Sequence, residues 1–186
     1  MNADESEIRN LVARIVDEVV TRPSVDAPAG GETIAVGADH GGFHLKQELI
    51  THLRDRGLEI HDCGCTSTAA VDYPDFAHAV ANLVGTGTCR WGLIVDGAGI
   101  GSSMVANKVP GVRAALCYDL SSARNSREHN HANVLTLGAG LIGPGLARQI
   151  VDEWLATPWG GDRHARRVAK ISGVEQRYLI AAKGGS

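Results

Sequence analysis

The sequence predicts an α/β fold in which a parallel sheet lies between two layers of helices. From residue 33 onward, short apolar runs alternate with segments of helical periodicity. The apolar runs are nearly continuous, which is typical of strands buried on both faces. A glycine-rich segment, 96–101, directly follows one of these runs. Such alternation favours a sheet whose ligands bind at the carboxyl ends of the strands.

Five strands and six helices are expected in the main part of the chain. The predicted strands are 33–36, 58–62, 91–95, 113–117 and 134–137. The predicted helices are 43–56, 73–84, 102–107, 120–128, 144–155 and 163–178. Gly57 directly follows the first of these helices, and we expect it to end that helix at the C′ position.

Residues 1–31 differ in character from the rest of the chain. Apolar residues recur there at helical spacing, with charged residues on the opposite side: Ile8, Leu11, Val12, Ile15, Val16 and Val19. Arg22-Pro23 ends the pattern, and a segment rich in proline and glycine follows. The sequence therefore predicts an amphipathic helix and flexible linker over 1–31, and a separate domain over 32–186.

Composition excludes several functional classes. A net charge of -3 gives no reason to expect nucleic acid or an acidic membrane as a partner. No apolar stretch approaches the ~20 residues that span a bilayer. Four cysteines without a signal peptide suggest reduced thiols in the cytoplasm. Cys63-Gly64-Cys65 has no second pair to complete a metal site, so we expect structural cysteines and no metal.

The segment Asp96–Gly101 is the first candidate site. Glycines allow backbone N–H groups to approach an anion, and a carboxylate stands beside them at Asp96. A base next to such donors is what proton abstraction beside a carbonyl requires. A dinucleotide site is an alternative, because Asp119 ends the next strand and could hold a ribose hydroxyl. However, the spacing is G-x-G-x-G rather than G-x-G-x-x-G, and a plain tight turn also fits.

Polar residues at other element ends allow two interpretations each. Asp39 and His40 either cap the helix that starts at residue 43 or bind substrate hydroxyls. His129 is either a solvated helix end or an acid–base group. Arg163 and Arg167 lie four residues apart on one helix face, where they suit a phosphate or form a solvated basic surface.

Six segments, in order, resemble the ribose-5-phosphate isomerase B / galactose-6-phosphate isomerase family. They are 37–43, 71–76, 97–101, 106–114, 127–130 and 160–167. The resemblance runs from about residue 33 to residue 178. It implies a Rossmann-like three-layer α/β/α sandwich with a five-stranded parallel sheet. It also implies a homodimer or dimer of dimers with shared active sites, and aldose–ketose isomerisation through a cis-enediolate without a cofactor.

The resemblance also implies roles for individual residues. Asp96 occupies the position of the proton-abstracting base, and His129 would open the furanose ring. Asp39 and His40 would contact sugar hydroxyls, Tyr73 would line the pocket, and Asn130 would lie beside His129. The enediolate oxygens would be held by Asn107 and by the backbone of Gly97, Ala98, Gly99 and Gly101, and the phosphate by Arg163 and Arg167.

This sequence departs from the family pattern at several of these positions. Relatives commonly carry a cysteine base where this chain has Asp96, and a second branch carries a glutamate where it has Ser102. Ala98 replaces a threonine or serine, and Gly140 replaces a phosphate-binding arginine. We expect a working carboxylate base and a small sugar phosphate substrate, either ribose 5-phosphate/ribulose 5-phosphate or a related sugar. The alternative is a non-catalytic sugar-phosphate-binding or assembly relative.

The N-terminal segment resembles the encapsulation peptides that direct enzymes into bacterial microcompartments. This resemblance implies a shell protein as a partner of residues 1–22. The alternative is a helix that docks on its own subunit or mediates oligomer contacts.

Overall fold

The computed structural model describes residues 32–183 of the chain. The chain divides into two compact units, one of which, Ala29–Trp159, contains the sheet. Gly160–Ser186 belongs to the other unit, whose described part carries the helix α7, Asp162–Lys183. The amphipathic helix, linker and domain boundary predicted for residues 1–31 lie outside the described residues.

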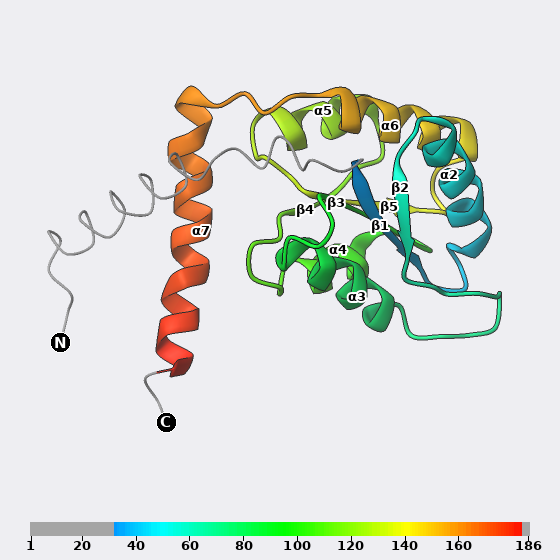
Figure 1. Ribbon diagram of the computed structural model, residues 1–186, viewed down its shortest axis with the longest axis horizontal. Helices are drawn as coiled ribbons and strands as arrows, with labels where there is room; N and C mark the ends of the chain where they lie inside the picture. The colour runs from blue at the N-terminus through cyan, green and yellow to red at the C-terminus, as the bar shows by residue number, and fades with distance from the viewer. Residues whose placement is uncertain (1–31, 184–186) are drawn as a thin grey trace, which may run out of the picture. The chain divides into compact units, whose positions relative to one another are not determined.

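The sheet has five parallel strands in the order β2-β1-β3-β5-β4 (Figure 1). The strands are β1 (Thr33–Ala38), β2 (Glu59–Asp62), β3 (Trp91–Asp96), β4 (Ala114–Leu116) and β5 (Val134–Gly138). All five predicted strands are confirmed. The chain extends the sheet on one side of β1 with β2 and on the other side with β3. In open α/β sheets, ligands bind beyond the carboxyl ends of strands at such a reversal.

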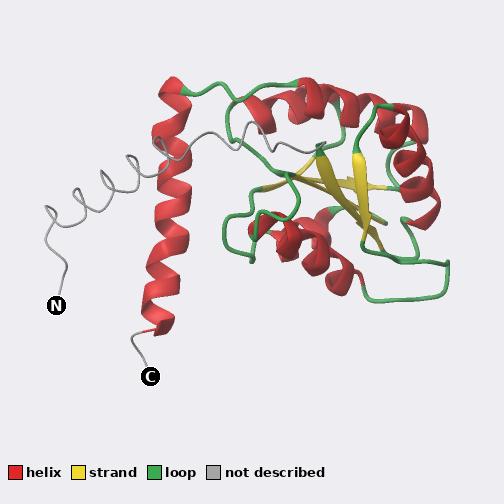
Figure 2. Cartoon of the chain, viewed as in Figure 1, coloured by secondary structure: helices red, strands yellow, loops and turns green. Residues whose placement is uncertain are grey.

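Helices cover both faces of the sheet (Figures 1 and 2). α2 (Phe43–Asp55), α5 (Leu120–Glu128) and α6 (Pro144–Ala156) pack on one face, and α3 (Tyr73–Gly85) and α4 (Ile100–Ala106) on the other. This is the predicted Rossmann-like three-layer α/β/α sandwich. The bounds of these five helices agree with the sequence to within two residues, whereas α7 continues to Lys183 instead of ending at 178.

The core consists of one aliphatic layer on each side of the sheet. Leu49, Leu53 and Ile150 are fully buried on the face of α2 and α6, and Val80 on the face of α3. Every residue of β3 and β5 is buried. These strands read as continuous apolar runs because helices cover both of their faces.

Gly57 ends α2 as the sequence predicts. Its φ angle is 84°, in the left-handed region that glycine adopts without strain. Its N–H donates to the carbonyl of Arg54 at 2.9 Å, and the N–H of Leu58 donates to Leu53 at 3.2 Å. These two bonds form a Schellman motif. Within residues 32–183, no helix combines the length and apolar character needed to cross a membrane.

Candidate active site at the carboxyl edge of the sheet

Two of the predicted site segments leave the sheet side by side. β1 and β3 are paired neighbours, with Ala38 opposite Val95, so the loops that follow them start together. A Cβ on Gly42 would lie 2.0 Å from the carbonyl oxygen of Val95. Only glycine allows the start of α2 to approach β3 this closely. The structure therefore brings the Asp39–His40 loop next to the glycine loop, defined here as residues 97–101.

Tyr73 joins these two loops from α3. A Cβ on Gly101 would lie 2.5 Å from Cζ of Tyr73, so the phenol ring lies directly on the start of α4. Nδ1 of His40 lies 3.2 Å from both the main-chain N and O of Val71, just before Tyr73. Oδ1 of Asp39 accepts the N–H of Gly42 at 2.9 Å. Three predicted site segments thus meet beyond the carboxyl ends of β1 and β3.

The Asp96 carboxylate is turned into its own loop. The residue is 5% exposed at the end of β3. Oδ1 accepts the N–H of Ala98 at 2.8 Å and that of Gly99, and Oδ2 accepts the N–H of Ser102 at 3.2 Å and its hydroxyl at 2.5 Å. A carboxylate offers about four acceptor sites. All of them are occupied, so Asp96 fixes the glycine loop and the first turn of α4.

Two further side chains fasten the glycine loop from neighbouring strands. The hydroxyl of Tyr118 donates to the carbonyl of Ala98 at 2.7 Å, and that of Thr136 donates to the carbonyl of Gly99 at 3.0 Å. Gly99 itself has a φ angle of 76°. Among the described residues, the N–H groups of Gly97, Ile100 and Gly101 have no acceptor. They are the loop donors that remain for an anionic ligand.

The sequence does not predict that Tyr118, Thr136 and Ser102 form hydrogen bonds that hold the glycine loop. In the sequence, Tyr118 stands just after a predicted strand and Thr136 within another, and neither position indicates a bond to the glycine loop. Ser102 is predicted only as the residue that replaces a glutamate of relatives. Its place in the first turn of α4, where N–H groups have no partner within the helix, is the signal that could have found it.

Gly140 lies against the same loop. Its N–H donates to the carbonyl of Gly97 at 2.9 Å, and a Cβ on Gly140 would also lie 2.9 Å from that oxygen. Any side chain at this position would have to displace the glycine loop. The glycine loop packs so closely on the end of β5 that an arginine at position 140 would not fit without moving this loop.

Asn107 uses its amide for the backbone. Its Nδ2 donates to the carbonyls of Ser103 and Ala114, and its Oδ1 accepts the N–H of Ala114, all at 2.9 Å. The amide joins the end of α4 to β4. In this arrangement neither N–H is left to donate to an enediolate oxygen, so the predicted contact of Asn107 is not available here.

His129 and Asn130 lie at the opposite edge of the sheet. α5 starts beyond the carboxyl end of β4 and returns to the amino end of β5. At that edge the guanidinium of Arg127 lies 4.1 Å from the ring of Trp91, the first residue of β3. Asp96 is the last of the six residues of β3, about 16 Å away at the usual rise per residue. One chain therefore does not bring His129 and Asp96 to the same substrate.

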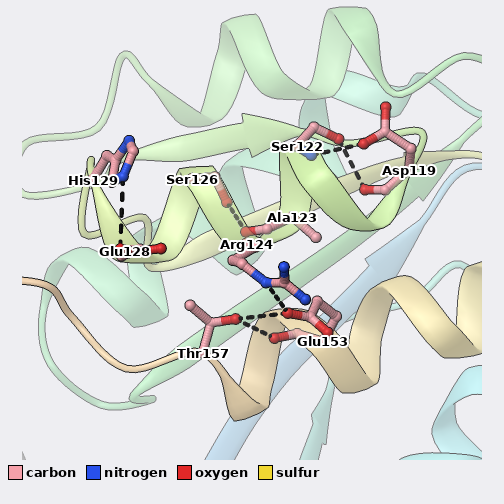
Figure 3. A network of polar contacts seen from close by, with 9 residues as sticks. All are labelled: Asp119, Ser122, Ala123, Arg124, Ser126, Glu128, His129, Glu153 and Thr157. Atoms are coloured by element: carbon pink, nitrogen blue, oxygen red, sulfur yellow. Dashed lines mark hydrogen bonds and ion pairs between the residues drawn. The ribbon is translucent and has the colours of Figure 1, made fainter.

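A network of polar contacts holds α5 in place (Figure 3). Oδ1 of Asp119 accepts the N–H of Ser122 at 2.7 Å, and this bond lowers the pKa of Asp119. Nε of Arg124 donates to Oε1 of Glu153 on α6 at 2.6 Å, which lowers the pKa of Glu153. At the end of α5, Nε2 of His129 lies 3.7 Å from Oε1 of Glu128. This network fixes the position of α5 and therefore the position of His129 at its end.

Arg163 and Arg167 lie in the first turns of α7, where both side chains are exposed. Nε of Arg163 donates to Nε2 of His164 at 3.1 Å. The spacing of four residues places both guanidinium groups on one face of α7, as the sequence predicts.

The thiols of Cys63 and Cys117 are not available as bases near neutral pH. Burial is the main cause that raises the pKa of Cys63 to about 11, and burial also raises the pKa of Cys117 at the end of β4. Among the described residues, no group of three or more histidine, cysteine, aspartate or glutamate side chains is placed to hold a metal ion.

Comparisons with known proteins agree on one family. Residues 34–171 match the family described as Ribose/Galactose Isomerase. The chain is 45% identical to the ribose-5-phosphate isomerase B of Escherichia coli over 144 residues, covering 77% of this chain and 97% of the relative. It is 39% identical to the D-erythrulose-4-phosphate isomerase of Pectobacterium atrosepticum, in a match that covers 78% of this chain and 96% of the relative. The solved structure of the Clostridium thermocellum ribose-5-phosphate isomerase B matches with a TM-score of 0.78 at 49% identity, covering 78% and 99%.

Proposed function

Since the chain belongs to the ribose/galactose isomerase family and is an aldose–ketose isomerase, we propose that it interconverts the two forms of a small sugar phosphate through a cis-enediolate. Candidate substrates are ribose 5-phosphate with ribulose 5-phosphate, or a related sugar. The observation that carries the proposal is the meeting of the Asp39–Gly42 loop, Tyr73 and the glycine loop beyond β1 and β3. A polar substrate placed there would contact hydroxyl-binding groups and main-chain donors together.

The proposed proton acceptor is Asp96. Both of its oxygens are engaged, so abstraction of a proton requires one oxygen to exchange a partner for the substrate. Oδ2 is better suited to this, because its two donors both come from Ser102. The N–H of Ser102 lies at 3.2 Å, and its hydroxyl can rotate away. Oδ1 stays bound to Ala98 and Gly99 and keeps the loop in place.

The proposed oxyanion donors are the N–H groups of Gly97, Ile100 and Gly101. They are main-chain groups in a loop that Asp96, Tyr118 and Thr136 hold rigid. Donors that are fixed before the reaction stabilise a developing negative charge without reorganisation. This arrangement replaces the hydroxyl that Ala98 lacks.

Two copies of the chain complete each proposed site. His129 acts on the ring oxygen of a furanose, yet it lies at the edge of the sheet opposite Asp96. A symmetric dimer can bring His129 and Asn130 of one copy to the carboxyl edge of the other. Arg163 and Arg167 are the proposed phosphate ligands, because two guanidinium groups on one helix face can form forked bonds with a phosphate.

A panel of sugar phosphates tests the function. The full chain is incubated with pentose 5-phosphates and tetrose 4-phosphates, and the conversion of aldose to ketose is followed by NMR. At least one pair is expected to reach equilibrium. Thermal stabilisation by sugar phosphates without conversion of any of them would contradict the proposal and identify a binding protein instead.

The proposed location is the cytoplasm, inside a microcompartment that residues 1–22 reach by binding a shell protein. The support is the amphipathic pattern and linker of the sequence. Deletion of residues 1–30 is expected to abolish co-localisation with the shell and to leave catalysis and folding unchanged. A changed oligomeric state in the truncated protein would instead assign this segment to subunit contacts.

A further inference from the structure

We propose that Asn125 is a positioning residue that holds His129 in the tautomer whose proton is on Nε2. The inference rests on the proposed role of His129 in ring opening. Asn125 and His129 lie one turn apart at the end of α5, where the N–H of His129 donates to the carbonyl of Asn125 at 2.9 Å. Nδ2 of the Asn125 amide lies 2.8 Å from Nδ1 of the His129 ring.

The orientation of the Asn125 amide follows from its contact with Asn130. Nδ2 of Asn130 lies 3.4 Å from the main-chain oxygen of Asn125, which can only accept a hydrogen bond. The same nitrogen lies 3.3 Å from Oδ1 of Asn125. If the Asn125 amide were reversed, its N–H groups would face those of Asn130. Oδ1 of Asn125 therefore faces Asn130, and its Nδ2 faces the histidine.

This orientation determines which nitrogen of His129 carries the proton. An amide nitrogen is only a donor, so Nδ1 must accept, and in a neutral imidazole the proton is then on Nε2. Oε1 of Glu128 lies 3.7 Å from Nε2, where a negative charge favours an N–H (Figure 3). The side chain of His129 is 36% exposed, so a substrate held by a second copy can reach it.

The tautomer determines the direction of proton transfer. As the bond between the anomeric carbon and the ring oxygen breaks, the bonding electron pair stays on the ring oxygen, which takes the proton from Nε2. The proton of the anomeric hydroxyl passes to water as the carbonyl forms, and the water returns a proton to Nε2, so that the neutral imidazole is restored without net change of charge. A histidine with its proton on Nδ1 would present a lone pair to the ring oxygen and could not act as this acid.

Sugar chemistry supplies a substrate that needs no such step. In a tetrose 4-phosphate the hydroxyl that would close a five-membered ring carries the phosphate. The sugar is therefore open, and its isomerisation requires the glycine loop and Asp96 but no ring opening. An aldopentose 5-phosphate, in contrast, is closed as a furanose, and its conversion to the ketose requires ring opening.

The variant Asn125→Asp tests the inference, with Asn82→Asp as the matched control. A carboxylate can only accept, so N125D forces the neutral ring to carry its proton on Nδ1. Asn82 is exposed on α3, so N82D makes the same change of charge elsewhere. Nitrogen-15 NMR of the histidine rings is recorded at about pH 9, above the ordinary range of imidazole. Conversion of a pentose 5-phosphate and of a tetrose 4-phosphate is measured for each protein.

The expected result has two parts. His129 carries its proton on Nε2 in the native chain and in N82D, and on Nδ1 in N125D. The kcat for the pentose falls in N125D on the order of 10²-fold, the usual contribution of a positioned acid, whereas the tetrose is converted at a rate within about twofold of native.

Three results would overturn the inference: a proton on Nδ1 in the native chain, a tautomer that N125D leaves unchanged, or an equal loss with both substrates. If the tautomers are as inferred but the native chain converts neither sugar, the proposed function fails while the assignment of the tautomer stands.

Discussion

At position 96, one carboxylate combines a structural bond network with a proposed chemical role. Oδ1 binds the N–H groups of Ala98 and Gly99, and Oδ2 binds Ser102. A carboxylate that is 5% exposed is tolerated in the core because four donors compensate for its lost hydration. The same donors must be partly released before the group can accept a proton from carbon.

Replacement of Asp96 by cysteine or by serine separates these two roles. Both side chains lose the bonds of the carboxylate, so both variants should lower the free energy of unfolding by a similar amount, about 2 kcal/mol or more. Only the thiol ionises within reach of neutral pH. D96C is therefore expected to isomerise at least about 10²-fold faster than D96S. Equal rates in two folded variants would show that Asp96 only anchors the loop.

At the scale of elements, α5 carries His129 away from the carboxyl edge. The helix begins after Asp119, whose side chain caps it, and ends nine residues later near the amino ends of the strands. The ion pair between Arg124 and Glu153 binds it to α6. The position of His129 therefore depends on how α5 begins as well as on how it ends.

The cap at Asp119 predicts a dependence of stability on pH. In the folded chain, the bond from the N–H of Ser122 lowers the pKa of Asp119 below its ordinary value of 3.8. The ionised carboxylate therefore stabilises the fold above pH 3.8, and this contribution is lost as the pH falls through the lower folded value. Asp119→Asn keeps an acceptor oxygen that does not titrate.

Thermal unfolding of the native chain and of D119N checks this expectation. The stability of the native chain relative to D119N should fall between about pH 5 and about pH 3. A difference in Tm that stays constant over this range would contradict the assigned cap.

Most elements could be predicted because apolar runs and helical spacing are local signals. The runs at 33–36 and 91–95 identified two central strands, and Gly57 marked the end of α2. The direction in which Asp96 turns could not be predicted. Its spacing from Ala98, Gly99 and Ser102 suits a cap as well as a base beside a ligand.

The hydrogen bonds between the Asn107 amide and the backbone of Ala114 could not be predicted either, because they depend on how α4 and β4 pack. The separation of His129 from Asp96 did have a signal. A helix that follows a strand in a parallel sheet returns to the amino edge, so its last residue lies far from the strand ends. This rule agrees with the expectation, implied by the family resemblance, that the active sites are shared between two subunits.

At the scale of the whole molecule, a site divided between two edges of the sheet predicts complementation between subunits. Mixed dimers of D96S and His129→Asn contain one site with both native residues. A pentose 5-phosphate should then be isomerised at about a quarter of the native rate after equal mixing and subunit exchange. Each variant alone should be inactive on this substrate. Mixtures no more active than the separate variants would contradict shared sites.

Solvent deuterium is the most direct test of the central claim, that the enzyme removes a proton from the carbon beside the carbonyl. The full chain is incubated in D₂O with the sugar phosphate that the panel identifies, and NMR follows that carbon. Proton abstraction by a solvent-exchangeable base predicts deuterium at this carbon in the recovered sugar, and none with D96S. Isomerisation without any incorporation would indicate direct hydrogen transfer between the two carbons and contradict the enediolate.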